Sequence, residues 1–361
     1  MSLLGSGDGS GLAITKNTGS QPLIGRATLL APASRLAGLT ALFLSAVTWA
    51  APPPERGIAL GLFSADAEQR YTPYLDEIRA QGATHVALVT VWYQRDVQAE
   101  ELRPRSGYTV SEDNLRRTIA AAHARGLKVM LFPIVGIEVR RAREWRGRIK
   151  PRRWDRWFMS YGDYVLHMAE IAAQTEVEVF SVGSELLSTE KLRDHWEPLL
   201  RRVRAVYPGP LLYSANWDHF EPVSFWDLVD VMGVTGYYEL TKERSPSRAD
   251  LVASWRRWQE PLVKFSRARE LPLVFTEIGY PSLDGTNIYP WDETRQEAVD
   301  LEEQLLCYQA FVAAWDGHPA LRGVYFWNWF GPGGTEDGDY SPRGKLAAAE
   351  IRRWYSAPQH R

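Results

Sequence analysis

Short apolar runs alternate with amphipathic segments along the chain from residue 57 onward. The segment 111–126 has helical periodicity, with Ser111 and Asp113 able to cap a helix and Gly126 able to end it. Near-continuous apolar strands separated by helices indicate a parallel sheet that is covered on its outside. Eight repeats of a strand followed by a helix in about 300 residues predict an α/β fold, a single (β/α)8 TIM barrel. The strands are expected at 57–63, 83–92, 127–135, 177–183, 210–215, 230–237, 271–277 and 322–329.

The first fifty residues follow a different pattern. A polar, Gly/Ser-rich start with three basic residues runs into the apolar segment 36–50, and then into the Pro-rich stretch APPPE. This order is typical of a secretory signal peptide with cleavage after Ala50, or of an uncleaved membrane anchor with a short apolar core. We therefore expect a leader with a signal peptide or anchor at 1–50, a linker at 51–56 and a catalytic domain at 57–361. Localisation is expected to be periplasmic or extracellular, with membrane contact only through an uncleaved leader.

Charge and composition exclude several classes of protein. The 42 basic and 44 acidic side chains nearly balance, so no global field favours nucleic acid. The single Cys307 cannot form an internal disulfide. Neither a dinucleotide-binding glycine motif, nor a phosphate loop, nor a G-x-S-x-G turn appears at the required position. The seven histidines are scattered without metal-ligand spacing, so we expect no metal and no organic cofactor.

Two glutamates stand at the ends of apolar strands, Glu185 on the fourth and Glu277 on the seventh. Barrels of this kind place their chemistry where strands end, and a buried carboxylate there is costly unless it is used. A carboxylate pair surrounded by aromatic side chains suits glycoside hydrolysis, in which one group donates a proton and the other attacks. The alternative is that each glutamate merely pairs with an arginine at the barrel mouth. Other strand-end residues are Trp92, Tyr93, Asn216, Trp217, Asp218, Tyr237, Tyr238, Trp327 and Trp329.

The sequence around these strand ends resembles that of glycoside hydrolase family 113, a family of clan A whose known members are mainly β-mannanases. The resemblance covers almost the whole chain after residue 57. It implies a two-glutamate retaining mechanism that needs no cofactor, with carboxyl groups about 5 Å apart. The similar stretches are VTVWYQ, WRGRIKPRRWDRWFMSY, VEVFSVGSELLSTE, LLYSANWD, FWDLVDVMGVTGYY, VFTEIGYPS and YFWNWF.

The resemblance also implies roles for single residues. Glu185 falls at the position of the general acid/base, and Glu277 at that of the nucleophile. Tyr237 matches a tyrosine that hydrogen-bonds the nucleophile, although one residue of register would exchange it with Tyr238. Trp327 matches the platform under the sugar. The remaining substrate contacts are expected at Trp92, Asn216, Trp217 and Tyr238.

The sequence departs from the family pattern in three places that bear on the choice of substrate. Ser184 stands where many clan A enzymes have asparagine, and Ile134 where a polar sugar contact is expected. Eight basic residues crowd 140–153, in a loop that either meets an acidic polysaccharide or is solvated and pairs with neighbouring acids. The best interpretation is a monomeric hydrolase of β-linked hexose polysaccharide or oligosaccharide, with β-1,4-mannan as first choice. The alternatives are a noncatalytic polysaccharide-binding barrel and a transglycosylase acting on a cell-surface glycan.

Overall fold

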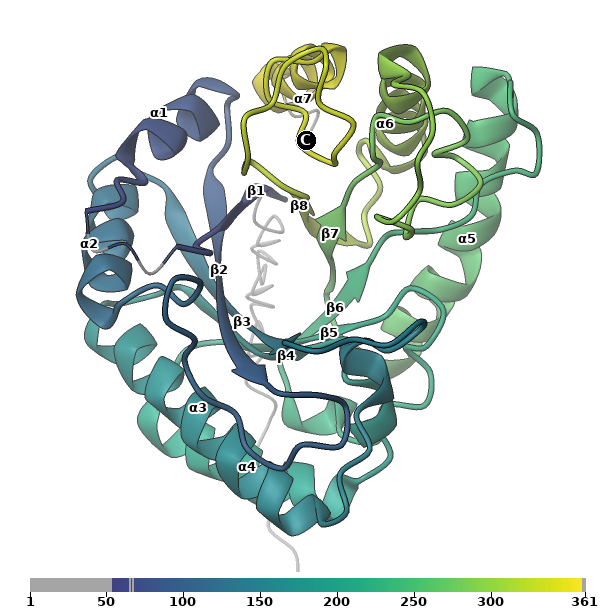
Figure 1. Ribbon diagram of the computed structural model, residues 1–361. Coiled ribbons are helices and arrows are strands. Elements are labelled where there is room, and N and C mark those ends of the chain that lie inside the picture. The colour runs from purple at the N-terminus through teal and green to yellow at the C-terminus, as the bar shows by residue number, and fades with distance from the viewer. Residues whose placement is uncertain (1–53, 65, 67, 359–361) are drawn as a thin grey trace, which may run out of the picture. The chain divides into compact units, whose positions relative to one another are not determined.

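A closed barrel of eight strands forms the centre of the computed structural model, which describes residues 54–64, 66 and 68–358 (Figure 1). Each strand pairs in parallel with the next in the chain, and β8 closes the ring onto β1. The predicted (β/α)8 barrel is therefore confirmed. The strands are β1 (Glu55–Gly61), β2 (His85–Gln94), β3 (Lys128–Ile137), β4 (Val179–Ser184), β5 (Leu211–Ala215), β6 (Val231–Thr235), β7 (Leu273–Ile278) and β8 (Leu321–Phe326).

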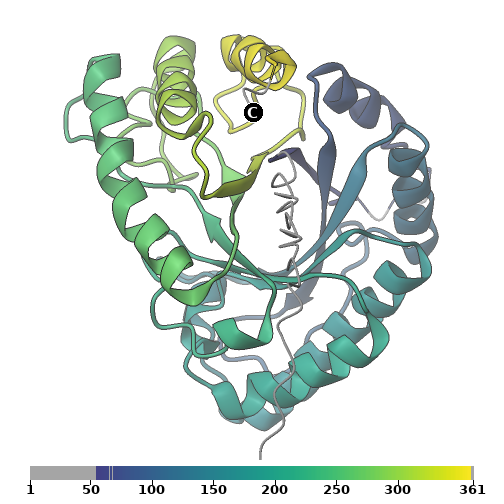
Figure 2. The ribbon, with the colours of Figure 1, turned by 180° about the vertical axis from the view of Figure 1, so that it is seen from behind.

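Helices surround the strands on the outside, as both views of the ribbon show (Figure 2). Polar side chains cap the amino-terminal ends of two helices: Ser111 caps α2 (Glu112–His123), and Ser247 forms a capping box with Asp250 on α5 (Arg248–Arg269). No helix in the described ranges is long and apolar enough to cross a membrane. The helices are α1 (Thr72–Ala80), α2 (Glu112–His123), α3 (Trp154–Gln174), α4 (Arg193–Val206), α5 (Arg248–Arg269), α6 (Leu301–Trp315) and α7 (Leu346–Ser356).

The barrel wall separates two hydrophobic clusters. The smaller one fills the interior and includes Val89, Phe132 and Tyr325, while the larger one lies between strands and helices. Side chains alternate along each strand, so neighbouring residues belong to different clusters. Most of the large aromatic residues pack in the outer cluster, where six tryptophans are almost completely buried: Trp157, Trp196, Trp226, Trp255, Trp315 and Trp329.

Some boundaries differ from those predicted. Strand β1 begins at Glu55, inside the expected 51–56 linker, because Glu55 already pairs with Gly323 of β8. Its buried carboxylate also accepts a 2.8 Å hydrogen bond from Tyr325 Oη. Strand β8 ends at Phe326, before the cis peptide bond between Trp327 and Asn328. The predicted leader at 1–50 lies outside the described residues, so its nature stays a prediction.

Strands β4 and β7 each carry one extra residue near their carboxyl ends. The pairing of β4 with β5 shifts between Ser181 and Ser184, and that of β6 with β7 shifts between Val234 and Thr235. A bulge re-aims the side chains that follow it. Both predicted glutamates therefore follow a break in strand register.

The barrel wall leaves no room for a side chain at Gly233 on β6. An added Cβ would lie 2.7 Å from the Tyr213 carbonyl oxygen, a backbone atom that cannot turn aside. We expect Gly233→Ala to lower the free energy of unfolding by about 1–3 kcal/mol. Urea denaturation measures this loss.

The matched control is Gly162→Ala on α3, where the added Cβ would meet its nearest neighbour, a Leu199 methyl carbon, at an ordinary 3.5 Å. Alanine favours a helix interior over glycine by up to about 1 kcal/mol. Unchanged or increased stability is therefore expected. Equal losses in the two variants would contradict the account of Gly233.

Candidate active site

The carboxylates of Glu185 and Glu277 come together at the carboxyl end of the barrel. Glu185 is 6% exposed and Glu277 only 2%. Thr235 connects them, because it pairs in register with Glu277 and its hydroxyl donates a 3.0 Å hydrogen bond to Glu185 Oε1. The sequence prediction that these two strand ends meet is consistent with this geometry.

Arg146 is the positive charge beside the two glutamates. Its Nη2 donates a 2.7 Å hydrogen bond to Glu185 Oε2 from the loop between β3 and α3. Burial disfavours the charge on this guanidinium, but the carboxylates of Glu185 and Glu277 outweigh burial and raise the pKa of Arg146 above its usual value. The arginine thus compensates both acidic groups.

Glu277 keeps its proton more strongly than an ordinary glutamate. Burial is the largest cause, the charge of Glu185 adds to it, and together they raise the pKa of Glu277 to about 7. Arg146 and the 2.8 Å hydrogen bond from Tyr237 Oη to Glu277 Oε2 act in the opposite direction. Glu277 is therefore mostly protonated below about pH 7 and loses its proton as the pH rises through that value.

Three buried polar atoms beside the pair have no hydrogen-bond partner among the described residues. They are Nε of Arg146, a donor, Oε1 of Glu277, an acceptor, and the hydroxyl oxygen of Ser184, which also contributes to lowering the pKa of Glu277. Buried polar atoms in folded proteins are normally paired, and exceptions require an explanation. A bound substrate that carries hydroxyl groups would supply partners for these atoms.

The backbone of Glu185 adopts a left-handed conformation, with φ of 54°. The next residue, Leu186, donates its amide hydrogen to Tyr213 Oη at 3.1 Å. Tyr213 Oη in turn donates to Glu190 Oε1 at 2.7 Å. This chain of hydrogen bonds fixes the turn that carries Glu185.

Glu190 joins three loop segments behind this turn. Its side chain is completely buried, and Oε2 lies 2.6 Å from Nδ1 of the partly exposed His219. Its backbone carbonyl accepts hydrogen bonds from the amide and the hydroxyl of Ser224. Burial raises the pKa of Glu190, while the hydrogen bonds from Tyr213 and His219 oppose that rise. The loops after β4 and β5 are thus tied together next to Glu185.

Trp327 lines the inside of the barrel, beside the end of β7. Its ring packs against the interior cluster, and its amide donates a 2.7 Å hydrogen bond to the Ile278 carbonyl. The ring of Tyr340 meets that of Tyr237 edge to face, 5.7 Å between centroids. These aromatic side chains form one side of the site.

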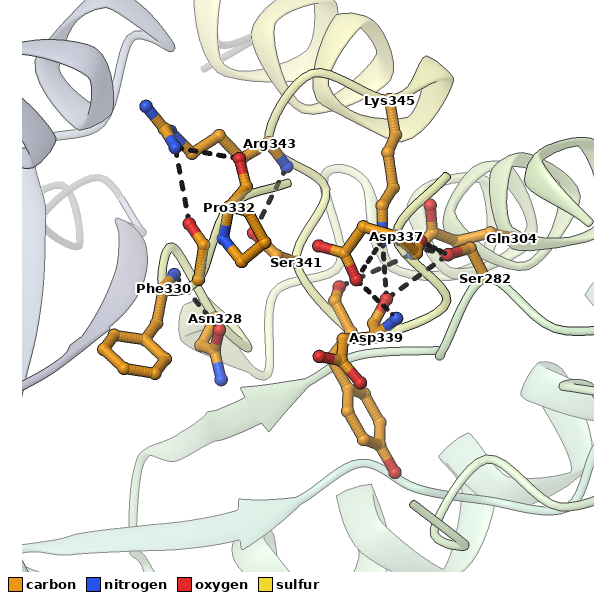
Figure 3. Close-up of polar contacts among 12 residues, drawn as sticks. Ser282, Gln304, Asn328, Phe330, Pro332, Asp337, Asp339, Ser341, Arg343 and Lys345 are labelled. Atoms are coloured by element: carbon orange, nitrogen blue, oxygen red, sulfur yellow. Dashed lines mark hydrogen bonds and ion pairs between the residues drawn. The ribbon is translucent and has the colours of Figure 1, made fainter. Parts of the chain in front are cut away.

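The segment 328–345, between β8 and α7, is held by buried polar contacts (Figure 3). The fully buried ammonium group of Lys345 donates to Ser282 Oγ at 2.9 Å and to the Asp339 carbonyl at 2.7 Å, and lies 3.7 Å from Asp337 Oδ1. Burial lowers the pKa of Lys345, and the two aspartates counteract this. Arg343 donates to the Pro332 carbonyl at 3.0 Å. These contacts fix the segment that carries Tyr340.

Three of the predicted substrate contacts are not brought to the glutamates. Trp92 stacks on Tyr164 on the outer side of β2, at 4.8 Å between ring centroids. Trp217 and Tyr238 pack against each other and against Trp258, also in the outer layer. Side-chain alternation along a strand explains these placements.

The structure resolves the register of the two tyrosines after β6, because Tyr237, and not Tyr238, contacts Glu277. Asn216 lies at the end of β5, is 8% exposed, and donates to the carboxylate of Asp218. Ile134 lines the barrel interior, where it presents an apolar side chain.

The basic loop 140–153 is partly neutralised by acidic residues. Arg140 pairs with Glu293 at 3.3 Å, and Arg153 pairs with Glu100 at 2.8 Å. Together with the pair formed by Arg146, these contacts agree with the interpretation that the loop's arginines pair with neighbouring acids. They also connect the loop to other parts of the barrel mouth.

Arg146 and Thr235 were not expected at this site from the sequence. Arg146 was one of eight basic residues in a loop, and the sequence gives no signal that it alone is partly buried. Thr235 could have been found, because it lies two residues before Tyr237 and so on the same side of a regular strand.

A closed (β/α)8 barrel with two buried carboxylates at the carboxyl ends of β4 and β7 is the arrangement of a glycoside hydrolase. Comparison with protein families agrees: residues 63–343 match the model of Glycoside Hydrolase Family 113. The chain belongs to this family, and it is a β-mannanase-like glycoside hydrolase. No curated protein matches it significantly.

Solved structures show the same relationship. A GH113 β-mannanase from Alicyclobacillus acidocaldarius is 31% identical, with a TM-score of 0.73 over 84% of this chain and 97% of that one. A second GH113 β-1,4-mannanase is 25% identical, with a TM-score of 0.76 over 84% and 99%. A β-glucuronidase from Faecalibacterium prausnitzii, 17% identical, has a TM-score of 0.58 over 86% of this chain and 50% of that one, and shares only the fold.

The raised pKa of Glu277 predicts a pH-dependent stability. Because the pKa is about 7 in the folded state and near 4.5 in the unfolded chain, the folded protein loses this contribution to stability as pH rises through that interval. Glu277→Gln removes the titration. We expect the variant to gain stability relative to wild type between pH 4.5 and 7, by on the order of 2–3 kcal/mol at most.

Urea denaturation at several pH values checks this prediction. Glu221→Gln, at an exposed position, provides the control and should differ from wild type by a constant amount. A constant difference for Glu277→Gln as well would show that Glu277 is not held protonated in the folded protein.

Proposed function

We propose that this protein hydrolyses β-linked hexose polysaccharides or oligosaccharides with retention, by a two-glutamate double displacement, and that β-1,4-mannan is its substrate. The main support is the buried pair of Glu185 and Glu277, which shares Arg146 and keeps one carboxylate oxygen unpaired. The GH113 β-mannanases of similar structure support the choice of mannan. Ile134 gives no polar contact to a mannose hydroxyl, so that choice rests on the relatives.

In the first step, Glu277 attacks the anomeric carbon through its unpaired Oε1, while Tyr237 holds Oε2. A bond forms between Oε1 and the anomeric carbon as the glycosidic C–O bond breaks. Glu185 transfers its proton to the departing oxygen, so that the leaving chain ends in a hydroxyl. The product of this step is a glycosyl ester on Glu277.

In the free protein, burial and the charge of Glu185 favour the protonated form of Glu277 below about pH 7. The first step needs an ionised Glu277, so this proton has to leave Glu277 before the attack. Arg146 can stabilise the ionised Glu277, because it already interacts with both carboxylates.

In the second step, Glu185 removes a proton from water, and the resulting hydroxide displaces Glu277 from the anomeric carbon. The ester bond breaks, Glu277 leaves as a carboxylate, and the sugar is released with its original configuration. A sugar acceptor in place of water would give transglycosylation with the same residues. We also propose that the protein acts after export, as the pattern of its first fifty residues indicates.

Amide variants test the two roles. Glu277→Gln and Glu185→Gln should each lower turnover on mannan by about a thousandfold or more, because each removes a group that takes part in bond making. An activated aryl glycoside needs no proton on its leaving group, so Glu185→Gln should regain much of the bond-cleavage step on that substrate, while Glu277→Gln should not.

Released reducing ends, measured on a panel of mannan, glucan, xylan and an acidic polysaccharide, identify the substrate. Proton NMR of the first products reports the anomeric configuration. Near-normal activity of Glu277→Gln, or inverted products, would contradict the proposal. Binding of a polysaccharide without cleavage by wild type would instead favour the noncatalytic alternative.

Removing the charge of Arg146 should shift the pH dependence of kcat/KM. Its charge lowers the pKa of Glu277, so Arg146→Met should raise that pKa. The limb of the kcat/KM profile that reports the ionisation of Glu277 should then shift to higher pH, by on the order of one unit. Arg141→Met, on the exposed part of the same loop, is the control and should leave the profile in place. A simple loss of activity without any shift would contradict the role assigned to Arg146.

A further inference from the structure

A cavity of about 460 Å³ lies on the outer side of β2, away from the two glutamates. The buried side chains of Thr90 and Met168 line it together with residues of the loop after β2, the first turn of α2, and α3. It is within the size range of small-molecule binding pockets. Glu185 and Glu277 do not line it, so it is separate from the site described above.

Trp92 gives this cavity an aromatic wall. One face of its ring stacks on Tyr164, with an angle of 14° between the rings. The half-buried indole also lines the cavity. A supported indole ring next to an accessible cavity offers a flat, rigid surface on which the C–H face of a pyranose ring can pack.

Two donor groups lining the cavity lack acceptors. The guanidinium group of Arg105 lies 4.0 Å from the ring centroid of Tyr108, but it forms no hydrogen bond with a residue in the described ranges. Indole Nε1 of Trp92 likewise has no hydrogen-bond acceptor in the described part of the chain. A ligand rich in oxygen would supply the acceptors that both groups lack.

The cavity also contains a group that accepts hydrogen bonds. The exposed carboxylate of Glu112 lines it; Oε1 accepts a 2.8 Å hydrogen bond from Arg116 Nε, and Oε2 lies 3.5 Å from Nε2 of His167. An apolar ligand would leave Arg105 and Trp92 unpaired, and a ligand with acceptor atoms only would offer no donor to Glu112. A neutral sugar, whose hydroxyl groups both donate and accept, satisfies the whole set.

We propose that this cavity is a second saccharide-binding site, which takes a neutral hexopyranose unit of the polysaccharide against Trp92. The inference rests on the proposed function, since that function supplies the class of ligand. The location of the cavity at the barrel mouth also supports a second saccharide-binding site. Tyr93, the next residue, belongs to the barrel interior, and Arg105 lies 5.5 Å from its ring centroid while lining the cavity on the other side. A long polymer bound in the catalytic cleft would thus have a second point of attachment beyond the barrel wall.

Indole N–H resonances test the proposal in the slow variant Glu277→Gln, labelled with 15N-tryptophan and titrated with mannotriose. Each resonance is assigned by its loss from a double variant: that of Trp92 when Trp92→Leu is combined with Glu277→Gln, and that of Trp327 when Trp327→Leu is combined with Glu277→Gln. We expect the Trp92 resonance to shift in a saturable manner, with a dissociation constant different from that reported by Trp327. Arg105→Met should weaken the binding seen at Trp92 at least fivefold.

Trp354→Leu is the control, because Trp354 is also half-buried but lies on α7. It should leave the titrations of both Trp92 and Trp327 unchanged. Should Trp92→Leu fail to fold, Trp92 can be assigned by the conservative Trp92→Phe, and Arg105→Met still tests the site.

The outcomes separate this inference from the proposed function. A shift of Trp327 with no shift of Trp92, or an Arg105→Met titration equal to the parent, would overturn the second site alone. If wild type cleaves no β-linked hexose polysaccharide and neither resonance responds to mannotriose or cellotriose, the proposed function fails as well.

Discussion

The arrangement of the buried Glu185 and Glu277 beside the partly buried Arg146 is the constraint on which the rest of the site depends. Two carboxylates in a poorly hydrated space repel each other, and neither can be ionised there without a compensating charge. Arg146 supplies that charge from the loop after β3, and the raised pKa of Glu277 shows the part of the cost that remains. The loop therefore has to be held in place. Its ion pairs with Glu293 and Glu100, formed by Arg140 and Arg153, connect it to other parts of the barrel.

The barrel wall decides which aromatic side chains can serve this site. Residues adjacent in sequence face opposite sides, so Tyr237 reaches Glu277 while Tyr238 packs among the helices. The same rule puts Tyr93 inside and Trp92 outside. A chain with many aromatic residues thereby builds two surfaces from one strand: an inner one for chemistry, and an outer one that is either core or, at β2, the wall of a cavity.

The sequence predicted the eight strands and the position of the two glutamates, because long apolar runs and strand ends are local signals. It did not predict which side Trp92 and Trp217 face, since a β-bulge or a one-residue change of register reverses that choice. It also missed Arg146, because the contact of one arginine among eight basic residues with Glu185 depends on how the whole loop folds. Glu55 was placed in a linker for the same reason: its hydrogen-bond partner, Tyr325, lies at the other end of the chain.

The left-handed backbone at Glu185 places an acidic residue where glycine would fit with less strain. The hydrogen bonds that pass from Leu186 through Tyr213 to Glu190 hold the chain in that conformation. Selection for stability alone would favour glycine at position 185, and with it the loss of the carboxylate. A search for more heat-resistant variants of this barrel should therefore leave this position and its supporting residues untouched, because here a more stable fold and a working active site require different residues.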